Sequence, residues 1–405
     1  MAGPVLRTRP QRRPDAGVVA LVLSLAIAIA APVLLGSGLA LSMATQIAWL
    51  AIVLLANNLL LGRCGLLSFG HALQVGAGAL AGVAAMRWGA AGGAMPLPLV
   101  PLVGGLAALA LSVPLGFVAT RAAGTAFAMV TLALGELAAA AALMLPDWFG
   151  GEAGLTADRA YGRWWGLDFG APLQVYGLVV VHALVCGWLL HALGDTALGR
   201  LLAAVRDNPA RAAFLGHDPR RLRWLAYAIA GFFAGIGGAL GAVQFEIVST
   251  AEAVGLARSG SYLLFTYLGG TAQFLGPVLG SVLMVLSTTW LSLWTPAWPL
   301  YLGAVFLLTV MYAPTGLAGC LAAAPAAVRR HGWPRCLAAL VGGSLLGAGG
   351  VALVELGYRW RWHGDAPAWL GHAVDLHAAP VWMAAVATAA VGAVLLAAAF
   401  RGAGR

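Results

Sequence analysis

The chain has 405 residues, of which 61% are hydrophobic and only 9% are charged. It contains several uncharged apolar runs of about 20 residues, the length that crosses a bilayer core. The formal net charge of +9 would suggest nucleic-acid binding in a soluble chain, but here it fits the excess of positive charge in cytoplasmic loops. We therefore expect an all-α, polytopic transmembrane helical bundle that contacts membrane lipid and no nucleic acid.

Two residue types limit the chemistry of the chain. No Lys occurs in the sequence, so the G-x-x-x-x-G-K-[ST] loop that holds nucleotide phosphates is absent. Any ATP that drives this protein must be hydrolysed by a partner, and we expect this chain to bind no cofactor. Cys64, Cys186, Cys320 and Cys336 occur singly, so the spacing predicts neither a metal site nor a disulfide framework. We interpret all four as small buried residues.

The N-terminus indicates how the chain enters the membrane. Residues 1–16 are basic and precede an apolar run of about 20 residues, from Gly17 to Gly36. A signal peptide usually has a shorter apolar region, so we favour a first span that starts in the cytoplasm. Counting spans alternately then places segment 195–223 and both termini in the cytoplasm. The next spans are predicted near 39–62, 66–86, 97–120, 124–145, 173–194 and 224–244.

A long region without charge follows the seventh predicted span. Between Arg258 and Arg329 no charged residue occurs, and three short spans rather than two long ones place Arg329 inside. These spans are predicted near 260–276, 277–293 and 299–318, and two more, near 336–356 and 380–400, complete a count of twelve. The first break lies where glycines and a proline disfavour a continuous helix, at Gly269, Gly270, Gly276 and Pro277.

Segment 195–223 is rich in Arg and Asp and carries helix signals. Asn208 before Pro209 is a helix-start pattern, Gly216 can end that helix, and Asp218 before a proline starts the next one. A solvated basic loop would explain the arginines but not these caps. Two isolated turns that carry apolar Phe214 are not stable in water. We therefore expect a soluble partner to cover this helix.

Polar side chains also occur within the predicted spans. Asn57, Asn58, Ser68, His71 and Gln74 either form hydrogen bonds between helices or line a translocation path.

Glu136 is an acid deep in a predicted span, where a central charge costs about 2.5–3.5 kcal/mol. It is either a gate or coupling residue, or it forms a hydrogen bond to a neighbouring helix, for which His71 and His182 are the expected partners.

Several of these stretches resemble one family, the permeases of branched-chain amino-acid ABC importers of the LivH/LivM type. The run "GRLLAAVRDNPARAAFLGHDPRRLRWLAYAIAGFFAGIGGAL" is similar to the coupling loop and following helix of that family, and "NLLLGRCGLLSFGHALQVGAGAL" is similar to its most characteristic run. The motifs "VTLALGEL", "GGEAGL", "GGTAQFLGPVLG" and "PTGLAG" follow in family order. The resemblance covers roughly residues 40–320.

The resemblance implies a permease subunit rather than an enzyme, with a core of about ten helices over residues 17–320 and an extension over 321–405. It implies a bacterial inner-membrane location, a second permease subunit, two cytoplasmic ABC ATPase subunits and a periplasmic substrate-binding protein. From the polar residues within the spans, we expect the translocation path to include Asn58, Ser68, His71, Gln74 and Glu136. The implied ATPase-coupling residues are Arg206, Asp207, Asn208, Pro209, Arg211, Ala212, Phe214, Leu215 and Gly216.

The sequence leaves more than one class of substrate possible. Branched-chain or other small amino acids are implied first, and urea or short amides are an alternative for the same kind of permease. An ion-coupled secondary transporter would place several ionisable residues near the bilayer midplane, where this sequence offers only Glu136 and a few His. An intramembrane enzyme is disfavoured, since neither a metal-ligand cluster nor a G-x-S-x-G motif occurs.

Overall fold

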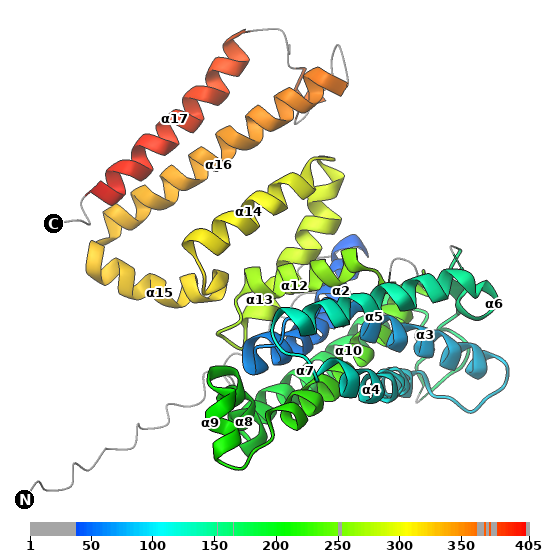
Figure 1. Ribbon diagram of the computed structural model, residues 1–405. Coiled ribbons are helices and arrows are strands. Elements are labelled where there is room, and N and C mark those ends of the chain that lie inside the picture. Colours follow the sequence, from blue (N-terminus) through cyan, green and yellow to red (C-terminus); the bar gives the residue numbers. More distant parts are fainter. Residues whose placement is uncertain are drawn as a thin grey trace, which may run out of the picture. The chain divides into compact units, whose positions relative to one another are not determined.

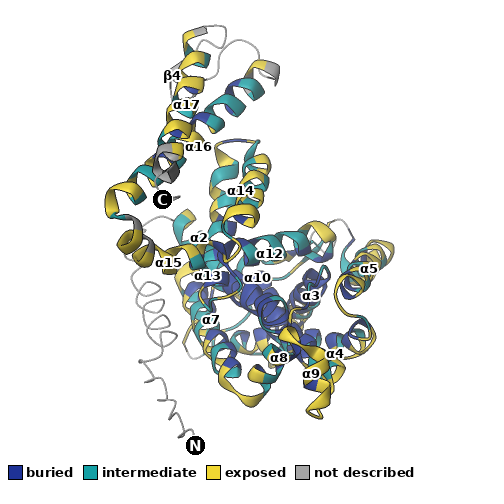
Figure 2. Cartoon of the chain, turned by 60° about the vertical axis from the view of Figure 1, so that its left-hand side comes forward, coloured by how far each residue is buried: buried dark blue, intermediate teal, exposed yellow. Residues whose placement is uncertain are grey.

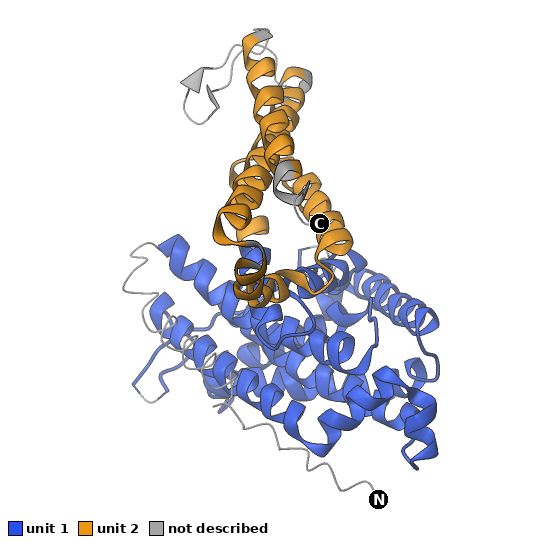
Figure 3. Ribbon diagram, turned by 90° about the vertical axis from the view of Figure 1, so that its left-hand side faces the viewer, with its two compact units in different colours: residues 1–285 blue, residues 286–405 orange. Residues whose placement is uncertain are grey.

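The computed structural model describes residues 38–151, 153–164, 166–249, 253–362, 368–369, 372–373 and 379–401, and these are mostly helical. Within them, seven helices are long and apolar enough to cross a membrane, or eight if one bent pair forms a single span. The predicted helical membrane bundle is confirmed at this level. The predicted N-terminal segment 1–16 and first span 17–36 lie outside the described residues. The chain divides into two compact units, Met1–Val285 and Leu286–Arg405 (Figure 3).

The first unit is a bundle of helices with one two-stranded ribbon (Figure 1). In the ribbon, Leu155 pairs with Val248 in antiparallel register. The described elements are α2 (Gly38–Asn58) with a π-helical turn η1 (Leu59–Cys64), α3 (His71–Ala90), η2 (Leu97–Leu99), α4 (Val100–Ala119), α5 (Thr125–Met144), α6 (Pro146–Phe149), β1 (Leu155–Thr156), α7 (Pro172–Asp195), α8 (Ala197–Asp207), α9 (Pro209–Phe214), α10 (Pro219–Phe245), β2 (Ile247–Val248), α12 (Leu256–Gly269) and α13 (Gly276–Val285).

Helix α10 forms the core of this unit, and 89% of its most apolar window is buried (Figure 2). It packs against α2, α3 and α4. Small residues allow these backbones to approach closely, since a Cβ atom on Gly78 would lie 2.2 Å from the Gly235 carbonyl oxygen. A Cβ atom on Gly231 would lie 2.0 Å from Ser112 Oγ. Gly231 and Gly235, which have G-x-x-x-G spacing, therefore form a tight helix contact.

Two predicted spans have different boundaries in the structure. Helix α3 begins at His71 rather than at residue 66, because Gly65 at φ 71° turns the chain after η1 and the segment up to Gly70 is not helical. Residues 66–70 of that segment are alternately buried and half-buried, and Leu66 N donates to Leu60 O at 2.9 Å. Helix α12 ends at Gly269, so the predicted span 260–276 is also wrong in its limits. Non-helical backbone at membrane depth is tolerated where protein surrounds it.

The second unit contains η3 (Leu286–Trp290), η4 (Leu291–Leu293), α14 (Trp298–Tyr312), α15 (Gly316–His331), α16 (Trp333–Trp362), β3 (Ala368–Trp369), β4 (His372–Ala373) and α17 (Ala379–Arg401). Helices α14 and α15 are bent by 51° and form the pair that could be one span. Helix α16 packs along α17, with Leu356 and Ala385 in a small buried cluster. The boundary predicted between the permease core and the C-terminal extension, at residue 320, lies within α15. It stays a prediction.

The cysteines only partly follow expectation. Cys64 and Cys186 are buried, whereas Cys336 is half-buried and Cys320 is exposed. The prediction that all four are buried is wrong for these two, because α15 and the start of α16 present most of their residues on an open surface of the second unit.

Candidate functional site

Three side-chain caps shape segment 195–223 into separate helices. Thr196 Oγ1 accepts a hydrogen bond from Gly199 N at 3.2 Å, so it caps α8. Asn208 Oδ1 accepts from Arg211 N at 2.9 Å, and Asp218 Oδ1 accepts from Arg220 N at 2.9 Å. Gly216 at φ 85° follows α9 and allows the chain to turn. The helix predicted from Asn208 to Gly216 and the start predicted at Asp218 are confirmed.

Helix α9 presents an apolar end. Phe214 is 91% exposed and Leu215 is 72% exposed, whereas Ala212 is buried against its own unit. Pro209 and Arg211 are exposed beside them. A six-residue helix has little stability of its own, and its exposed Phe and Leu side chains gain free energy when a partner removes them from water.

Arg206 turns towards the bundle instead. Its Nη1 donates to the Gly62 carbonyl oxygen in η1, and its Nη2 lies 2.9 Å from Asp207 Oδ1. The side chain crosses Gly65, where a Cβ atom would lie 2.7 Å from Arg206 Cγ. Arg206 therefore joins the end of α8 to the end of α2, and Asp207 is its nearest counter-ion.

The structure brings only some of the predicted path residues together. Ser68, His71 and Gln74 are buried around the start of α3, and Gln74 Nε2 donates to Ser112 Oγ at 3.1 Å. Asn58 is buried at the end of α2, where a Cβ atom on Gly62 would lie 2.3 Å from its Oδ1. The Gln74–Ser112 contact is a hydrogen bond between α3 and α4, which is one of the two roles predicted for these polar residues.

Glu136 lies in the middle of α5 and is exposed in the isolated chain. Its Oε1 accepts a hydrogen bond from Leu256 N at 2.9 Å, at the first residue of α12. The expected partners are wrong, because His71 bonds to Val53 O and His182 bonds to Leu178 O in its own helix. The physical reason is that a helix N-terminus offers unpaired N–H groups and a positive dipole end, which attract a carboxylate.

The predicted helix break coincides with a gap between two helices. Helix α12 ends at Gly269, Gly270 adopts φ 111°, and α13 begins at Gly276 and Pro277. The backbone at Gly276 passes so close to the backbone at Gly270 that a Cβ atom on Gly276 would lie 1.8 Å from Gly270 O. Only glycine fits this approach, so the two short helices are held in a compact reversal.

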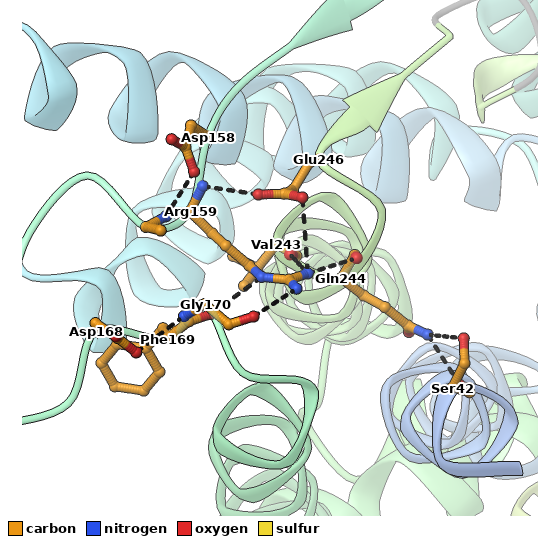
Figure 4. Close-up of polar contacts among 10 residues, drawn as sticks. Ser42, Asp158, Arg159, Asp168, Phe169, Gly170, Val243, Gln244 and Glu246 are labelled. Carbon is orange, nitrogen blue, oxygen red and sulfur yellow. Dashed lines mark hydrogen bonds and ion pairs between the residues drawn. The ribbon is translucent and has the colours of Figure 1, made fainter. Parts of the chain in front are cut away.

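A group of contacts that the sequence analysis missed surrounds Arg159, and we call Arg159, Gln244 and Glu246 the Arg159 clasp (Figure 4). Arg159 Nε donates to Phe169 O at 3.0 Å and Nη1 donates to Gln244 O at 3.0 Å. Arg159 N donates to Glu246 Oε1 at 3.0 Å, and the guanidinium lies 3.9 Å from Glu246 Oε2. The cation therefore sits on the last carbonyls of α10, where the helix dipole favours it.

The clasp extends to α2 through Gln244. Its Nε2 donates to Ser42 O at 2.9 Å and its Oε1 accepts from Trp49 Nε1 at 2.8 Å. Nearby, Tyr161 donates from its hydroxyl to Met95 O at 2.8 Å, and burial raises the pKa of Tyr161 above its ordinary value. The available sequence signal was the occurrence of charged residues in two predicted loops, Arg159 in one and Glu246 in the other.

Comparison with known proteins agrees with this architecture. The sequence profile of the family described as "Branched-chain amino acid transport system / permease component" matches residues 39–314. The chain is 28% identical over 319 residues to the high-affinity branched-chain amino acid transport system permease protein LivM of Escherichia coli, covering 73% of this chain and 74% of that protein. The Salmonella typhimurium LivM is 27% identical over 315 residues, with 72% and 73% covered.

A shorter similarity points to another permease. Over 126 residues the chain is 36% identical to the autoinducer 2 import system permease protein LsrC of Klebsiella pneumoniae, covering 30% of this chain and 36% of that protein. No solved structure gives a significant match.

Proposed function

Because this chain belongs to the branched-chain amino acid transport permease family, we propose that it forms part of the translocation path of an ABC importer for branched-chain or other small amino acids. The chain is a multi-pass membrane permease, and the family implies ATPase and binding-protein partners. We propose two cytoplasmic ATPase subunits, a second permease subunit and a periplasmic binding protein. ATP would be used by the ATPase subunits, and this chain would bind no cofactor.

Helix α9 is proposed as the element that docks on an ATPase subunit. The observation that supports this most is the exposed pair Phe214 and Leu215 at the end of a capped helix. From there the chain passes through Gly216 into α10, which is capped by Asp218 and buried along most of its length. A push on α9 would therefore move α10, and Arg206 would carry the same movement to η1 of α2.

The exposed face of α5 is proposed to line the path or its contact with the second permease. Glu136 lies at the middle of this helix, and a carboxylate facing lipid at that depth would cost about 2.5–3.5 kcal/mol. A water-filled path or a partner subunit removes that cost. Ser68, His71 and Gln74 approach the same region through the start of α3, since Phe69 N donates to Thr131 Oγ1 of α5 at 3.2 Å.

The number of spans and their orientation in the membrane are also part of the proposal. We propose twelve spans in the bacterial inner membrane, with both termini in the cytoplasm, ten helices in the permease core and two in the C-terminal hairpin. This orientation places most arginines inside, as the positive-inside rule requires. The Arg159 clasp would then lie at the periplasmic end of α10, opposite to α9.

A pull-down of the tagged chain in mild detergent, with partners identified by mass spectrometry, tests the docking role. We expect wild type to retain an ABC ATPase and a second permease, and the double variant Phe214→Asp and Leu215→Asp to lose only the ATPase. A matched control is the double variant Ala204→Asp and His217→Asp, which adds two charges at exposed positions on either side of α9. Loss of the ATPase from the control as well would contradict a specific role for α9.

The substrate is tested by uptake into proteoliposomes that contain the complete complex and its binding protein. We expect ATP-dependent uptake of a branched-chain amino acid. Autoinducer 2 is the second candidate, because 126 residues of the chain are 36% identical to an autoinducer 2 permease, and urea or short amides are a third. Competition between labelled leucine and each of these compounds ranks them, and uptake that collapses with a protonophore at constant ATP would oppose an ATP-driven mechanism.

A further inference from the structure

One face of α4 is exposed along the length of the helix. Exposed residues recur there every three or four positions, the period of one helix face, at Leu102, Leu106, Ala110, Val113 and Phe117. The buried face of α4 packs against α3 and α10. Since α4 forms most of an apolar span, the exposed face, which we call the α4 stripe, is suited to contact the acyl chains of lipids.

The α4 stripe ends at two arginines that share one aromatic ring. The Cζ atoms of Arg121, just after α4, and of Arg220, at the start of α10, lie 5.0 and 5.1 Å from the centroid of the Phe117 ring. Both distances are those of cation–π contacts. Trp224 of α10 packs edge-on against the same ring, with 6.3 Å between the centroids, and its Nε1 donates to Val113 O at 2.8 Å. The stripe and the two arginines therefore belong to one surface.

Neither of these two guanidinium groups has an acidic counter-ion among the residues that the structure describes. Asp218 lies close to Arg220 in the sequence, but its Oδ2 is 3.3 Å from Arg221 Nε and its Oδ1 caps α10. Arg121 and Arg220 are both exposed, and because they contact the same ring they are at most about 10 Å apart. An anion that contacts both would replace their weak repulsion by attraction.

The α4 stripe favours one kind of anion over the others. Acidic side chains of a soluble partner, or a free phosphate, would use only the two arginines. A phospholipid with a negative headgroup uses the whole surface, because its chains cover the stripe and its phosphate reaches the guanidinium groups. Trp224 then lies at the boundary between them, the layer of the membrane that tryptophan prefers. In the proposed orientation this is the cytoplasmic boundary, where anionic lipids attract basic residues.

We propose that Phe117, Arg121, Arg220 and Trp224 form a binding site for one anionic phospholipid, whose acyl chains lie along the α4 stripe. Arg121 and Arg220 donate hydrogen bonds to its phosphate oxygens, and such charge-assisted bonds are strong. The Phe117 ring restrains both guanidinium groups before the lipid arrives, which reduces the entropy lost on binding. The bound lipid joins the end of α4 to the start of α10, the helix that follows α9.

Three compounds test the proposal: phosphatidylglycerol, phosphatidylcholine with the same acyl chains, and glycerophosphoglycerol, which is the first headgroup without chains. The full chain is purified in mild detergent, and native mass spectrometry gives the affinity of the first bound molecule of each compound. We expect phosphatidylglycerol to bind about 25-fold more tightly than phosphatidylcholine, since each arginine near an anionic headgroup contributes about fivefold. Equal affinities of the two lipids overturn the proposal. Glycerophosphoglycerol that binds as tightly as phosphatidylglycerol would indicate a site for a free anion and overturns it too.

Three double variants locate the bound lipid. Arg121→Gln with Arg220→Gln should lower the affinity for phosphatidylglycerol about 25-fold and leave that for phosphatidylcholine unchanged. Arg121→Lys with Arg220→Lys keeps both charges and should retain most of the affinity, because lysine also binds phosphate as a point charge. The control, Arg329→Gln with Arg330→Gln, removes two exposed charges at the end of α15 and should have little effect. An equal loss in the control and in the first variant would indicate general attraction by charge and overturn the site.

The assembled complex distinguishes the lipid from a protein partner. Transport is not measured in these experiments, so their result does not depend on the proposed substrate. We expect the preference for phosphatidylglycerol in the isolated chain and also in the permease–ATPase complex. Loss of the preference on assembly would assign Arg121 and Arg220 to the contact with the ATPase and overturn the lipid site.

Discussion

Helices α10 and α16 are both long apolar helices, yet they occupy opposite environments. The most apolar windows have mean hydropathies of 1.7 in α10 and 2.0 in α16, but 89% of the α10 window is buried and only 11% of the α16 window. The less hydrophobic helix is therefore the more buried one. In a membrane, hydrophobicity decides only that a helix can span, because lipid is as apolar as a neighbouring leucine.

Backbone approach explains the difference. In α10, glycines face the backbones of neighbouring helices, and a Cβ atom on Gly238 would lie 2.0 Å from Val75 O. In α16, Gly349 approaches α17 in a similar way, since a Cβ atom there would lie 2.5 Å from Ala389 N, but the space around Gly350 is open, with nothing within 4 Å of the position of a Cβ atom. Close packing around small residues places a helix at the centre of a bundle, whereas a helix that carries large exposed residues such as Leu340 remains at its surface.

The same substitution in both helices gives the largest expected effect. Gly238→Val adds three carbon atoms beside the Val75 backbone, which cannot move locally, so we expect a loss of about 3 kcal/mol or more in folding free energy. Little correctly inserted protein should then be recovered from membranes. Gly350→Val is the matched control and should accumulate like wild type. Equal yields of the two variants, measured by fluorescence-detected size exclusion, would contradict the distinction.

A smaller effect is expected at the end of α10. Arg159→Met removes a cation from the last carbonyls of this helix and leaves Glu246 without its ion pair, so we expect destabilisation by about 2–3 kcal/mol. The thermal unfolding midpoint of the purified protein measures it. Arg163→Met, four residues along the same loop and exposed, should change the midpoint little. A similar drop in both variants would indicate a general effect of charge in this loop.

Helix α16 contains a buried acid that contacts residues in and before α14. Glu355 accepts a hydrogen bond from the Tyr301 hydroxyl at 2.8 Å and another from Thr295. Glu355→Leu leaves these hydroxyls without their acceptor, so we expect local destabilisation by about 1–2 kcal/mol, with faster hydrogen exchange in α14 and α16. Glu355→Gln keeps a carbonyl oxygen at this position and should stay closer to wild type. Faster exchange across α10 as well would show that the two units unfold together.

The smallest effect is expected before α10, at the cap of α9. Asn208→Ala removes the acceptor of the Arg211 N–H and should cost about 1 kcal/mol of local helix stability. Hydrogen exchange of residues 210–215 measures it and should rise, while exchange within α10 stays constant. Asn208→Asp retains an acceptor and serves as the control. Unchanged exchange in Asn208→Ala would mean that tertiary contacts alone hold α9.

Local patterns were sufficient for much of this protein. The apolar runs predicted a membrane bundle, and the dipeptides Asn208-Pro209 and Asp218-Pro219 predicted a capped helix and the start of α10, because span length and capping depend on neighbours in sequence. The glycine break between α12 and α13 belongs to the same class. Each of these features is set within a few residues of chain.

Other features depend on residues that are far apart in the sequence. Glu136 bonds to Leu256 N rather than to a histidine, and Arg159 bonds to the end of α10 across 85 positions. The chain turn at Gly65, which delays α3 to His71, requires a bundle that buries the non-helical segment. Composition determined that these helices can cross a membrane, and the tertiary structure decided which of them is central, because hydrogen-bond partners and backbone approach are chosen in space and not along the chain.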